Sequence, residues 1–317
     1  MVATVIPEAG GGRSRSPGGR VGAIRRRRLR LLVGWLMLSP ALGLVITFFV
    51  LPLITLVVMS FFNWPLIGSI RPVGLANYEA VLSDGNFGES LKFTLTFTVV
   101  LVPITLLVGY AAAVMVRSNV RGTGFFRTSF FLPVPVGLTA AAYMFSVLLA
   151  PGTGVFNVLL KAVGVTDGET AWFSATTPAF WAVIMITVWK GIGVPMILFM
   201  AGMQSIPDEL YEAAKIDGAG WLRRELSITL PLIRNVMALC LVLSVSGTLL
   251  TFDQFFVLTK GGPSNSTITA VFYNYVVSFV RYRLGYGAAV SVVLMLIILV
   301  VTLFQLRTFR TNAKAGA

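Results

Sequence analysis

The sequence predicts an all-α integral membrane protein with six transmembrane helices, and its composition, apolar stretches and charge distribution support that prediction. Of its 317 residues, 56% are hydrophobic and 12% are charged, whereas soluble domains carry about 25% charged residues. Six apolar stretches reach the roughly 20 residues that a helix needs to cross a bilayer. None of them alternates as the strands of a membrane barrel do.

The six predicted spans cover residues 31–62, 93–116, 129–150, 178–203, 236–259 and 284–306. An even number of spans places both termini on one side of the membrane. That side carries 18 Lys and Arg residues and the other carries 6, and because such residues are retained in the cytoplasm, it is predicted to be the cytoplasmic side. We expect a basic, disordered cytoplasmic tail at 1–30, a transmembrane domain at 31–310 and a short cytoplasmic tail at 311–317.

The composition also excludes several kinds of active site. The chain has no histidine, which excludes a histidine general base and histidine-ligated metals, and no metal site is expected. A single cysteine, Cys240, excludes an internal disulfide. In a soluble protein the net charge of +13 would suggest nucleic acid. Here retained cytoplasmic Lys and Arg residues explain the charge, so no nucleic-acid partner is predicted.

The segment 205–235 is a polar, glycine-containing stretch between two apolar runs, on the predicted cytoplasmic side. Ser205 and Asp208 have the spacing of a capping box, and Gly218 suits the end of a helix, so a short helix is predicted over 208–217. A second amphipathic piece begins with Trp221, Leu222 and Leu226. Two short helices joined at a glycine indicate a docking surface, and an ordinary interfacial loop is the alternative.

Within this segment, EAAKIDGAGWLRRELSITLPLI resembles the EAA loop of permease subunits of bacterial ABC importers. The family pattern is EAA, two residues, DGA and a later I-x-LP, and the matching positions are Glu212, Ala213, Ala214, Asp217, Gly218, Ala219, Ile228, Leu230 and Pro231. Two positions depart from it. Glu225 stands where the family commonly has Phe, and Asn235 stands where a second Pro often follows. We expect Leu226 to supply the apolar contact that Glu225 does not.

Other stretches resemble the sugar-type permeases of the maltose and glycerol-3-phosphate uptake group, the carbohydrate uptake transporter-1 family. They are VGLANYEAVL, SIPDELYEAA, TKGGPSNST and GYGAAVS, and the resemblance covers about residues 31–310. It implies the ABC type I importer permease fold in a bacterial plasma (inner) membrane. The partners it implies are a second homologous permease subunit, two copies of a cytoplasmic ABC ATPase, an extracytoplasmic sugar-binding protein and membrane lipid.

The resemblance also implies which residues contact the ATPase. In the family the first Glu of the motif pairs with a basic residue of the ATPase, and Glu212 takes that position; Asp217 and Gly218 would fix the turn. The implied ATPase-coupling residues are Glu212, Ala213, Ala214, Asp217, Gly218 and Ala219. The chain has no GxxxxGK[ST] phosphate loop. It is therefore expected to be a transporter subunit and not an enzyme, with ATP and Mg bound by the partner ATPase and no cofactor of its own.

Polar residues inside spans are expected to face the interior of the helix bundle. Lys190 and Asp253 are the charged examples, and they either form an ion pair or contact substrate. Gly247, Thr251 and Gln254 recur at helical spacing and so would share one face. By resemblance, the sugar-contacting positions fall on Thr187, Lys190, Gly191, Gly247, Thr251 and Gln254. Asp253 is added because of its intramembrane charge, and Trp189 and Phe252 are candidates for stacking on a sugar ring.

The function that the sequence predicts is therefore the permease subunit of an ATP-driven, binding-protein-dependent importer of a sugar, expected to be a di- or oligosaccharide. An ion-coupled secondary transporter of a small solute is the alternative, but such folds often contain inverted repeats and several midplane acids, and neither is evident here. A membrane-embedded enzyme is a third class, with few polar groups available for catalysis. The sequence leaves open whether the sugar is neutral or carries a phosphate or carboxylate that Lys190 would meet.

Overall fold

The computed structural model describes residues 33–117 and 122–314. The tail predicted at 1–30 lies outside the described residues. Contacts divide the chain into two units, Met1–Leu56 and Val57–Ala317, and each is described by itself. The described part of the first unit belongs to one helix, Val33–Met59, which contains a π-helical turn, η1 (Ile46–Val50), and continues as α2 (Leu51–Met59). Its mean hydropathy of 2.7 and its 27 residues suffice for a membrane span.

The second unit is helical apart from a two-stranded hairpin, β1 (Phe62–Asn63) and β2 (Arg71–Pro72). Two helices follow the hairpin, α3 (Ala76–Ser83) and α4 (Gly85–Val116). The others are α5 (Thr123–Phe131), α6 (Leu138–Leu148), α7 (Val155–Ala162), α8 (Thr176–Gly191), α9 (Gly193–Gln204), α10 (Asp208–Ile216), α11 (Trp221–Arg224), η2 (Glu225–Thr229), α12 (Leu230–Leu232), α13 (Arg234–Leu249), α14 (Asp253–Leu258), α15 (Ala270–Tyr275), η3 (Val276–Val280) and α16 (Leu284–Lys314). The segments η2 and η3 are π-helical.

Four helices in the described residues are long and apolar enough to cross a membrane, and α8 with α9, bent by 45°, makes a fifth if the pair is one span. The third predicted span, 129–150, differs from expectation because α5 ends at Phe131 and α6 begins at Leu138. Pro133, Pro135 and Gly137 lie in between, and proline cannot continue a helical hydrogen-bond ladder. The eleven residues of α6 extend only about 16 Å, so α6 alone does not cross a bilayer.

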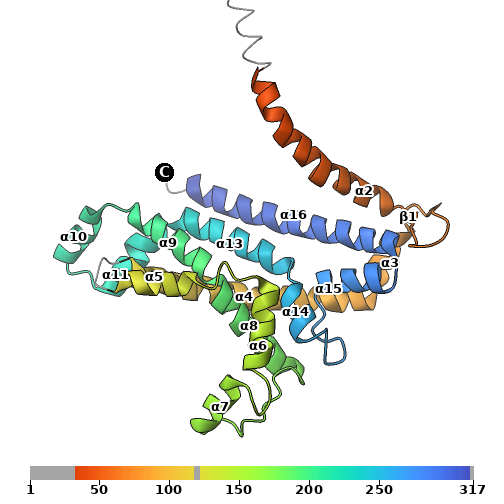
Figure 1. Cartoon of the computed structure of the whole chain (residues 1–317). Coiled ribbons are helices and arrows are strands. Elements are labelled where there is room, and N and C mark those ends of the chain that lie inside the picture. Colours follow the sequence, from red (N-terminus) through yellow and green to blue (C-terminus); the bar gives the residue numbers. More distant parts are fainter. Residues whose placement is uncertain (1–32, 118–121, 315–317) are drawn as a thin grey trace, which may run out of the picture. The chain divides into compact units, whose positions relative to one another are not determined.

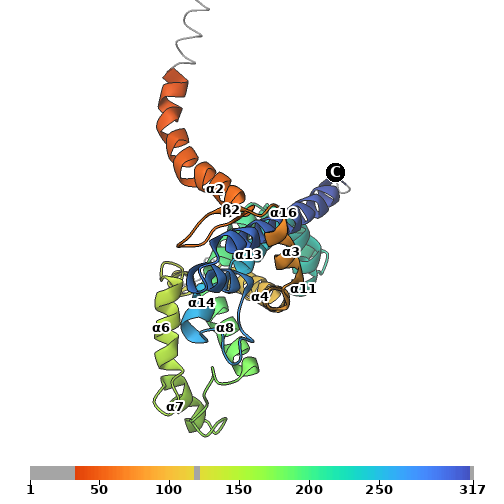
Figure 2. The ribbon, with the colours of Figure 1, turned by 90° about the vertical axis from the view of Figure 1, so that its right-hand side faces the viewer.

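Helix α4 is central to the second unit and contacts α8, α9, α13 and α15. Its 32 residues extend about 48 Å. Small residues let α9 approach closely: a Cβ on Gly109 of α4 would lie 2.9 Å from the Pro195 Cβ. Figures 1 and 2 show α13 beside α16, with α10 and α11 at one end of these helices and α3 at the other. The ends of α4 therefore have different surroundings.

The end of α4 near α3 is fixed by the carboxylate of Asp84. Its Oδ1 accepts the backbone N–H of Asn86 at 2.9 Å and so caps α4. Its Oδ2 accepts hydroxyl hydrogen bonds from Tyr273 of α15 and from Tyr286 of α16, the latter at 2.6 Å. Partial burial on its own would raise the pKa of Asp84, but the hydrogen bonds from the tyrosines and backbone outweigh burial, and the pKa is lowered. One carboxylate thus joins three helices.

Candidate functional site

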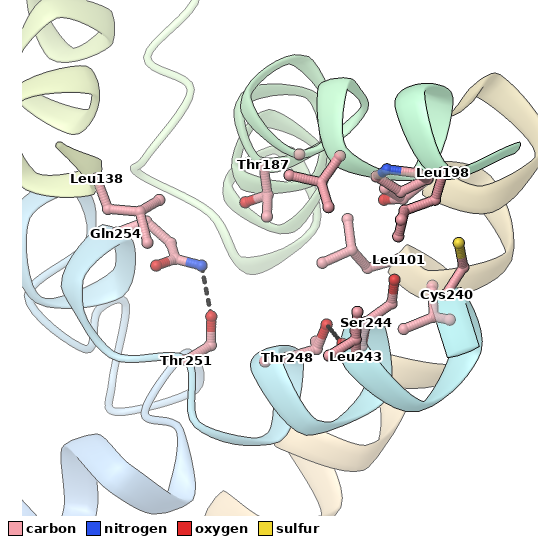
Figure 3. Close-up of a pocket in the computed structure, with 16 residues that line it drawn as sticks. Leu101, Leu138, Thr187, Leu198, Cys240, Leu243, Ser244, Thr248, Thr251 and Gln254 are labelled. Carbon is pink, nitrogen blue, oxygen red and sulfur yellow. Dashed lines mark hydrogen bonds between the residues drawn. The ribbon is translucent and has the colours of Figure 1, made fainter. Parts of the chain in front are cut away.

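A cavity of about 240 Å³ lies between α4, α8, α9 and α13, and the turn before α14 closes part of its wall (Figure 3). Its polar lining comes from hydroxyl and amide groups, and none of the described residues that line it carries a charge. The lining residues are Leu101, Val102, Thr105, Leu138, Thr187, Gly191, Val194, Pro195, Leu198, Cys240, Leu243, Ser244, Gly247, Thr248, Thr251 and Gln254. This composition suits an uncharged polar ligand.

Gln254 gives this cavity an unsatisfied hydrogen-bond acceptor. Its side-chain Nε2 donates to the Thr251 hydroxyl at 2.6 Å, and the residue is 1% exposed (Figure 3). Its Oε1 is buried and has no hydrogen-bond partner among the described residues. Buried polar atoms are normally paired, and an unpaired one requires an explanation. A ligand hydroxyl that donates to Oε1 would supply the missing bond.

A break in the predicted fifth span places Gln254 and Thr251 at the cavity. α13 ends at Leu249 and α14 begins at Asp253, and the Thr269 hydroxyl donates to the Thr251 carbonyl across the break at 2.8 Å. Gly247, Thr251 and Gln254 therefore do not share the face of one continuous helix as expected, but all three line the cavity. Gly247 contributes open space, because a Cβ there would meet no atom within 4 Å.

The structure separates the seven predicted pathway residues into two groups. Five line the cavity, namely Thr187, Gly191, Gly247, Thr251 and Gln254. Lys190 and Asp253 do not. The Lys190 Nζ donates to the Val134 carbonyl oxygen at 3.1 Å, and these two described side chains form no ion pair with each other. Val134 lies in the break between α5 and α6, where a carbonyl without a helical partner needs a donor.

Other lining residues were not among the predicted ones. Ser244 and Thr248 line the cavity beside Gly247 and Thr251, and their spacing of i, i+3, i+4 and i+7 is the signal that would have identified them. Thr105 of α4 has no comparable signal. The two aromatic candidates pack elsewhere: Trp189 contacts Phe145, and Phe252 contacts Phe256, Phe272 and Tyr275.

The predicted short helix of the polar loop is present as α10, which ends at Ile216, and Gly218 follows its C-cap with a φ of +74°, as expected for a glycine that terminates a helix. The Gly218 N–H donates to the Lys215 carbonyl at 3.0 Å, and the Ala219 N–H donates to the Ala214 carbonyl at 2.8 Å. This pair of bonds is a Schellman motif, which satisfies the last carbonyls of the helix. The predicted capping box is wrong, because the Ser205 hydroxyl donates backward to the Gly202 carbonyl at 2.7 Å and so leaves α10 without a side-chain cap.

None of the described residues covers the outer surface of α10. Glu212, Ala213, Asp217 and Gly218 are exposed, and Ala214 and Ala219 are partly exposed. Tyr211 is the one buried residue of the helix. A short helix with two acidic residues in its first turn and small exposed alanines offers a partner both charge and close approach.

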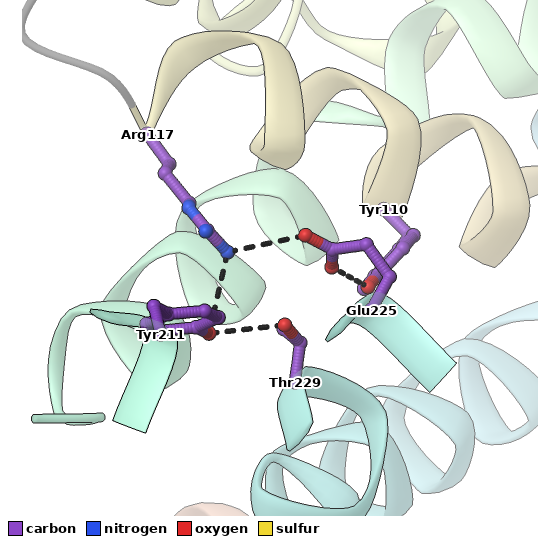
Figure 4. Close-up of polar contacts among 5 residues, drawn as sticks. All are labelled: Tyr110, Arg117, Tyr211, Glu225 and Thr229. Carbon is purple, nitrogen blue, oxygen red and sulfur yellow. Dashed lines mark hydrogen bonds and ion pairs between the residues drawn. The ribbon is translucent and has the colours of Figure 1, made fainter. Parts of the chain in front are cut away.

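On its inner side, α10 meets a polar network centred on Glu225 (Figure 4). Glu225 is 4% exposed; its Oε2 accepts the Tyr110 hydroxyl at 2.6 Å, and its Oε1 lies 3.5 Å from Nη1 of Arg117. The same Nη1 is 3.4 Å from the Tyr211 hydroxyl, which bonds the Thr229 hydroxyl at 3.0 Å. Leu226 is 56% exposed, so the apolar contact expected of it stays a prediction, and the buried residue at this point of the loop is Glu225.

Comparison with known proteins places these features in context. Residues 105–310 match the model of a family described as "Binding-protein-dependent transport system inner membrane component". The chain is 34% identical to the multiple sugar-binding transport system permease protein of Streptococcus mutans, over 89% of this chain and 97% of that one. It is 33% identical to the trehalose/maltose transport system permease protein of Thermococcus litoralis, over 88% of this chain and 94% of that one.

A lactose transport system permease protein of Rhizobium radiobacter is 33% identical, over 86% of this chain and 92% of the relative. Among solved structures, a chain of a bacterial ABC transporter involved in the import of the acidic polysaccharide alginate superposes with a TM-score of 0.77. It is 23% identical and matches 91% of this chain and 99% of that one. At that identity the likeness establishes the fold, which is that of an ABC importer permease.

Proposed function

The chain belongs to the family of binding-protein-dependent transport system inner membrane components, and we propose that it forms half of the pathway by which an ATP-driven importer moves a neutral sugar. The other half would come from a second, homologous permease. Three relatives, whose names specify multiple sugars, trehalose and maltose, and lactose, favour a sugar as cargo. A di- or oligosaccharide agrees with those names.

The observation that carries this proposal is the uncharged, hydroxyl-rich cavity with the unpaired Gln254 oxygen. Sugar hydroxyls donate and accept, so they match threonine hydroxyls and an amide. The Thr187 and Thr248 hydroxyls donate to backbone carbonyls of their own helices, each at 2.7 Å, which leaves their oxygens as acceptors. With Lys190 directed to Val134, no cation among the described residues lines the cavity to balance a phosphate or carboxylate, which favours a neutral sugar over a charged one.

In this proposal the exposed surface of α10 is the contact for an ATPase, and the family description names a binding protein. Two ABC ATPases would bind ATP and Mg, one of them against α10 through Glu212, and an extracytoplasmic sugar-binding protein would deliver the cargo. The α5–α6 segment would complete a sixth passage through the bacterial inner membrane despite its break, so that both termini are cytoplasmic. Non-helical backbone at membrane depth is tolerated where protein covers it or it lines a cavity.

The test is reconstitution of the purified complex in proteoliposomes, with ATP hydrolysis and uptake measured for maltose, trehalose, lactose, a sugar phosphate and a uronate. We expect a neutral sugar to stimulate both activities. Thr251→Val should raise the KM for that sugar by about tenfold, the value of one lost hydrogen bond of about 1 kcal/mol or somewhat more. Thr96→Val, on an exposed position of α4, is the control. Preference for the charged sugars, or solute movement by this chain without ATP, would refute the proposal, and the second result would favour an ion-coupled secondary transporter.

A further inference from the structure

A buried carboxylate in the loop that carries α10 is unexpected, because an isolated buried charge is strongly unfavourable. Glu225 is tolerated through two partners on α4, the Tyr110 hydroxyl at 2.6 Å and the Arg117 guanidinium at 3.5 Å. Tyr110 and Arg117 are seven residues apart, which is two helical turns, so both side chains leave α4 on the same face. Removing one partner of such a buried pair lowers the free energy of unfolding by more than the intact pair contributes to it, because the other charge is left buried and unpaired.

Segment η2 faces the network with two residues that are four positions apart and therefore lie on one side of the helix. Glu225 and Thr229 are the first and last residues of η2, and both are buried, at 4% and 0% exposed. A π-helical turn accommodates an extra residue and is frequent at functional sites. Thr229 bonds the Tyr211 hydroxyl at 3.0 Å, so η2 is attached to α4 through Glu225 and to α10 through Thr229.

Arg117 closes the connection between α4 and α10. Its guanidinium carbon lies 4.7 Å from the centroid of the Tyr211 ring, a cation–π contact, while its Nη1 is 3.5 Å from Glu225 (Figure 4). Tyr211 is the buried residue of α10. Three elements, α4, α10 and η2, therefore meet through five side chains that bond to one another.

Both helices that leave this junction reach the cavity. On α4, Thr105 lines the cavity and Tyr110 begins the network five residues later, about 7.5 Å along the axis. In the other direction η2 continues through α12 into α13, whose residues Cys240, Ser244 and Thr248 line the cavity. A displacement of α10 would thus move the cavity walls through α4 and through α13. This requires that the contacts among α10, η2 and α4 remain intact during the movement.

We propose that Glu225 is a positioning residue that makes α10, η2 and the adjoining end of α4 move as one body during the ATP-driven cycle. This inference rests on the proposed role of α10 as the ATPase contact. Glu225 stands where the family that the sequence resembles commonly has Phe, so a buried carboxylate takes this place here. Arg117 and Tyr110 are the partners that allow the carboxylate to remain there.

The test compares Tyr110→Phe, Glu225→Gln and the double variant in the complete reconstituted transporter. Tyr110→Phe keeps the ring and removes one hydrogen bond, and Glu225→Gln keeps the shape and removes the charge. We expect the ATPase subunits to co-purify with each variant, while sugar uptake per ATP hydrolysed falls by about tenfold, as expected for one lost hydrogen bond to a charged group. In the double variant, sugar uptake per ATP hydrolysed should fall little further than in the single variants, because the two side chains act as one unit. Glu79→Gln, an exposed carboxylate of α3, is the matched control.

A distance measurement separates positioning from general stability. Spin labels at Met115 of α4 and Ile216 of α10, which are 57% and 87% exposed, would report the separation of the two helices with and without trapped ATP in a Cys240→Ala background. We expect one narrow, unchanged distance in the native junction and a broad or shifting one in Glu225→Gln. Unchanged uptake per ATP together with unchanged distances in both single variants would overturn the inference. Failure of the native chain to retain ATPase would instead overturn the proposed function.

Discussion

Gly247 shows how a single residue can determine the space available to cargo. A Cβ at this position would meet no atom within 4 Å, so larger side chains would extend into the cavity of about 240 Å³ without displacing protein atoms. Gly247→Ala should keep transport and raise stability by up to about 1 kcal/mol, because alanine is the better helix former. Gly247→Leu should abolish sugar uptake while its Tm stays at or above that of the native protein. Normal uptake by Gly247→Leu would place the pathway elsewhere.

The contribution of Asp84 to the stability of the fold should depend on pH. Its pKa is lowered in the folded protein, so its charged form stabilises the fold above the unfolded pKa of about 3.9. That contribution is lost as the pH falls below this value and through the lower folded pKa. Asp84→Asn keeps an N-cap side chain and removes the charge. The Tm difference between native protein and Asp84→Asn should be largest near neutral pH and should shrink below about pH 4; a difference that grows on acidification would contradict the assignment.

Single residues also show where sequence reasoning succeeds and where it cannot. Gly218 was predicted to end a helix because a left-handed φ favours glycine, and that local rule held. Ser205 satisfied an equally local rule, but its hydroxyl bonds Gly202 instead. The burial of Glu225 depends on Tyr110 and Arg117, more than 100 residues away in the chain. No local pattern contains that information, so the sequence did not predict that Glu225 would be buried among polar partners.

At the scale of elements, α10 should bind the ATPase only when its C-terminal end is correctly formed. Gly218→Pro is incompatible with φ +74° and removes the N–H that bonds the Lys215 carbonyl. We expect this variant to insert into the membrane but to lose most of its co-purifying ATPase and all sugar uptake. Gly220→Ala is the matched control in the same loop, because Gly220 has a negative φ and open space around it. Glu212→Ala should resemble Gly218→Pro, and normal uptake by either would contradict the docking role.

The close approach of α4 and α9 gives a second prediction for elements. A methyl group on Gly109 would lie 2.9 Å from the Pro195 Cβ and 3.5 Å from the Ile192 carbonyl. Gly109→Ala should therefore lower the free energy of unfolding by about 1–3 kcal/mol, the usual effect of overpacking, despite the better helix propensity of alanine. Thermal unfolding in detergent measures this loss of stability. Gly247→Ala is the internal comparison, because it adds the same methyl group at a position where no atom lies within 4 Å of it. Equal stability of the two variants would mean that the helices separate easily.

For the whole molecule, hydropathy identified the long spans but not the form of the third one. The helices Gly85–Val116 and Leu284–Phe309 contain the predicted spans 93–116 and 284–306, because long apolar runs have few alternatives in a bilayer. The stretch 129–150 is also apolar but breaks at Pro133 and Pro135, between the short helices α5 and α6. Apolarity alone cannot distinguish a continuous helix from two pieces held by neighbours, since membrane spans tolerate proline when tertiary contacts satisfy the backbone. The number of passages therefore depends on whether the α5–α6 segment crosses the membrane.

Single-cysteine labelling decides that number, and the parity of the passages makes the prediction sharp. In a Cys240→Ala background, Ile67→Cys, Val165→Cys and Ile216→Cys place probes at positions that are 90%, 66% and 87% exposed. With six passages and cytoplasmic termini, a membrane-impermeant maleimide should label positions 67 and 165 in intact spheroplasts, and position 216 only after permeabilisation. If the α5–α6 segment does not cross, position 165 would be protected and position 216 would react from outside, where no ATPase is available. Because Lys215 lies in α10 and Arg223 and Arg224 lie in the following α11, and the cytoplasmic side retains such residues, we expect the six-passage result.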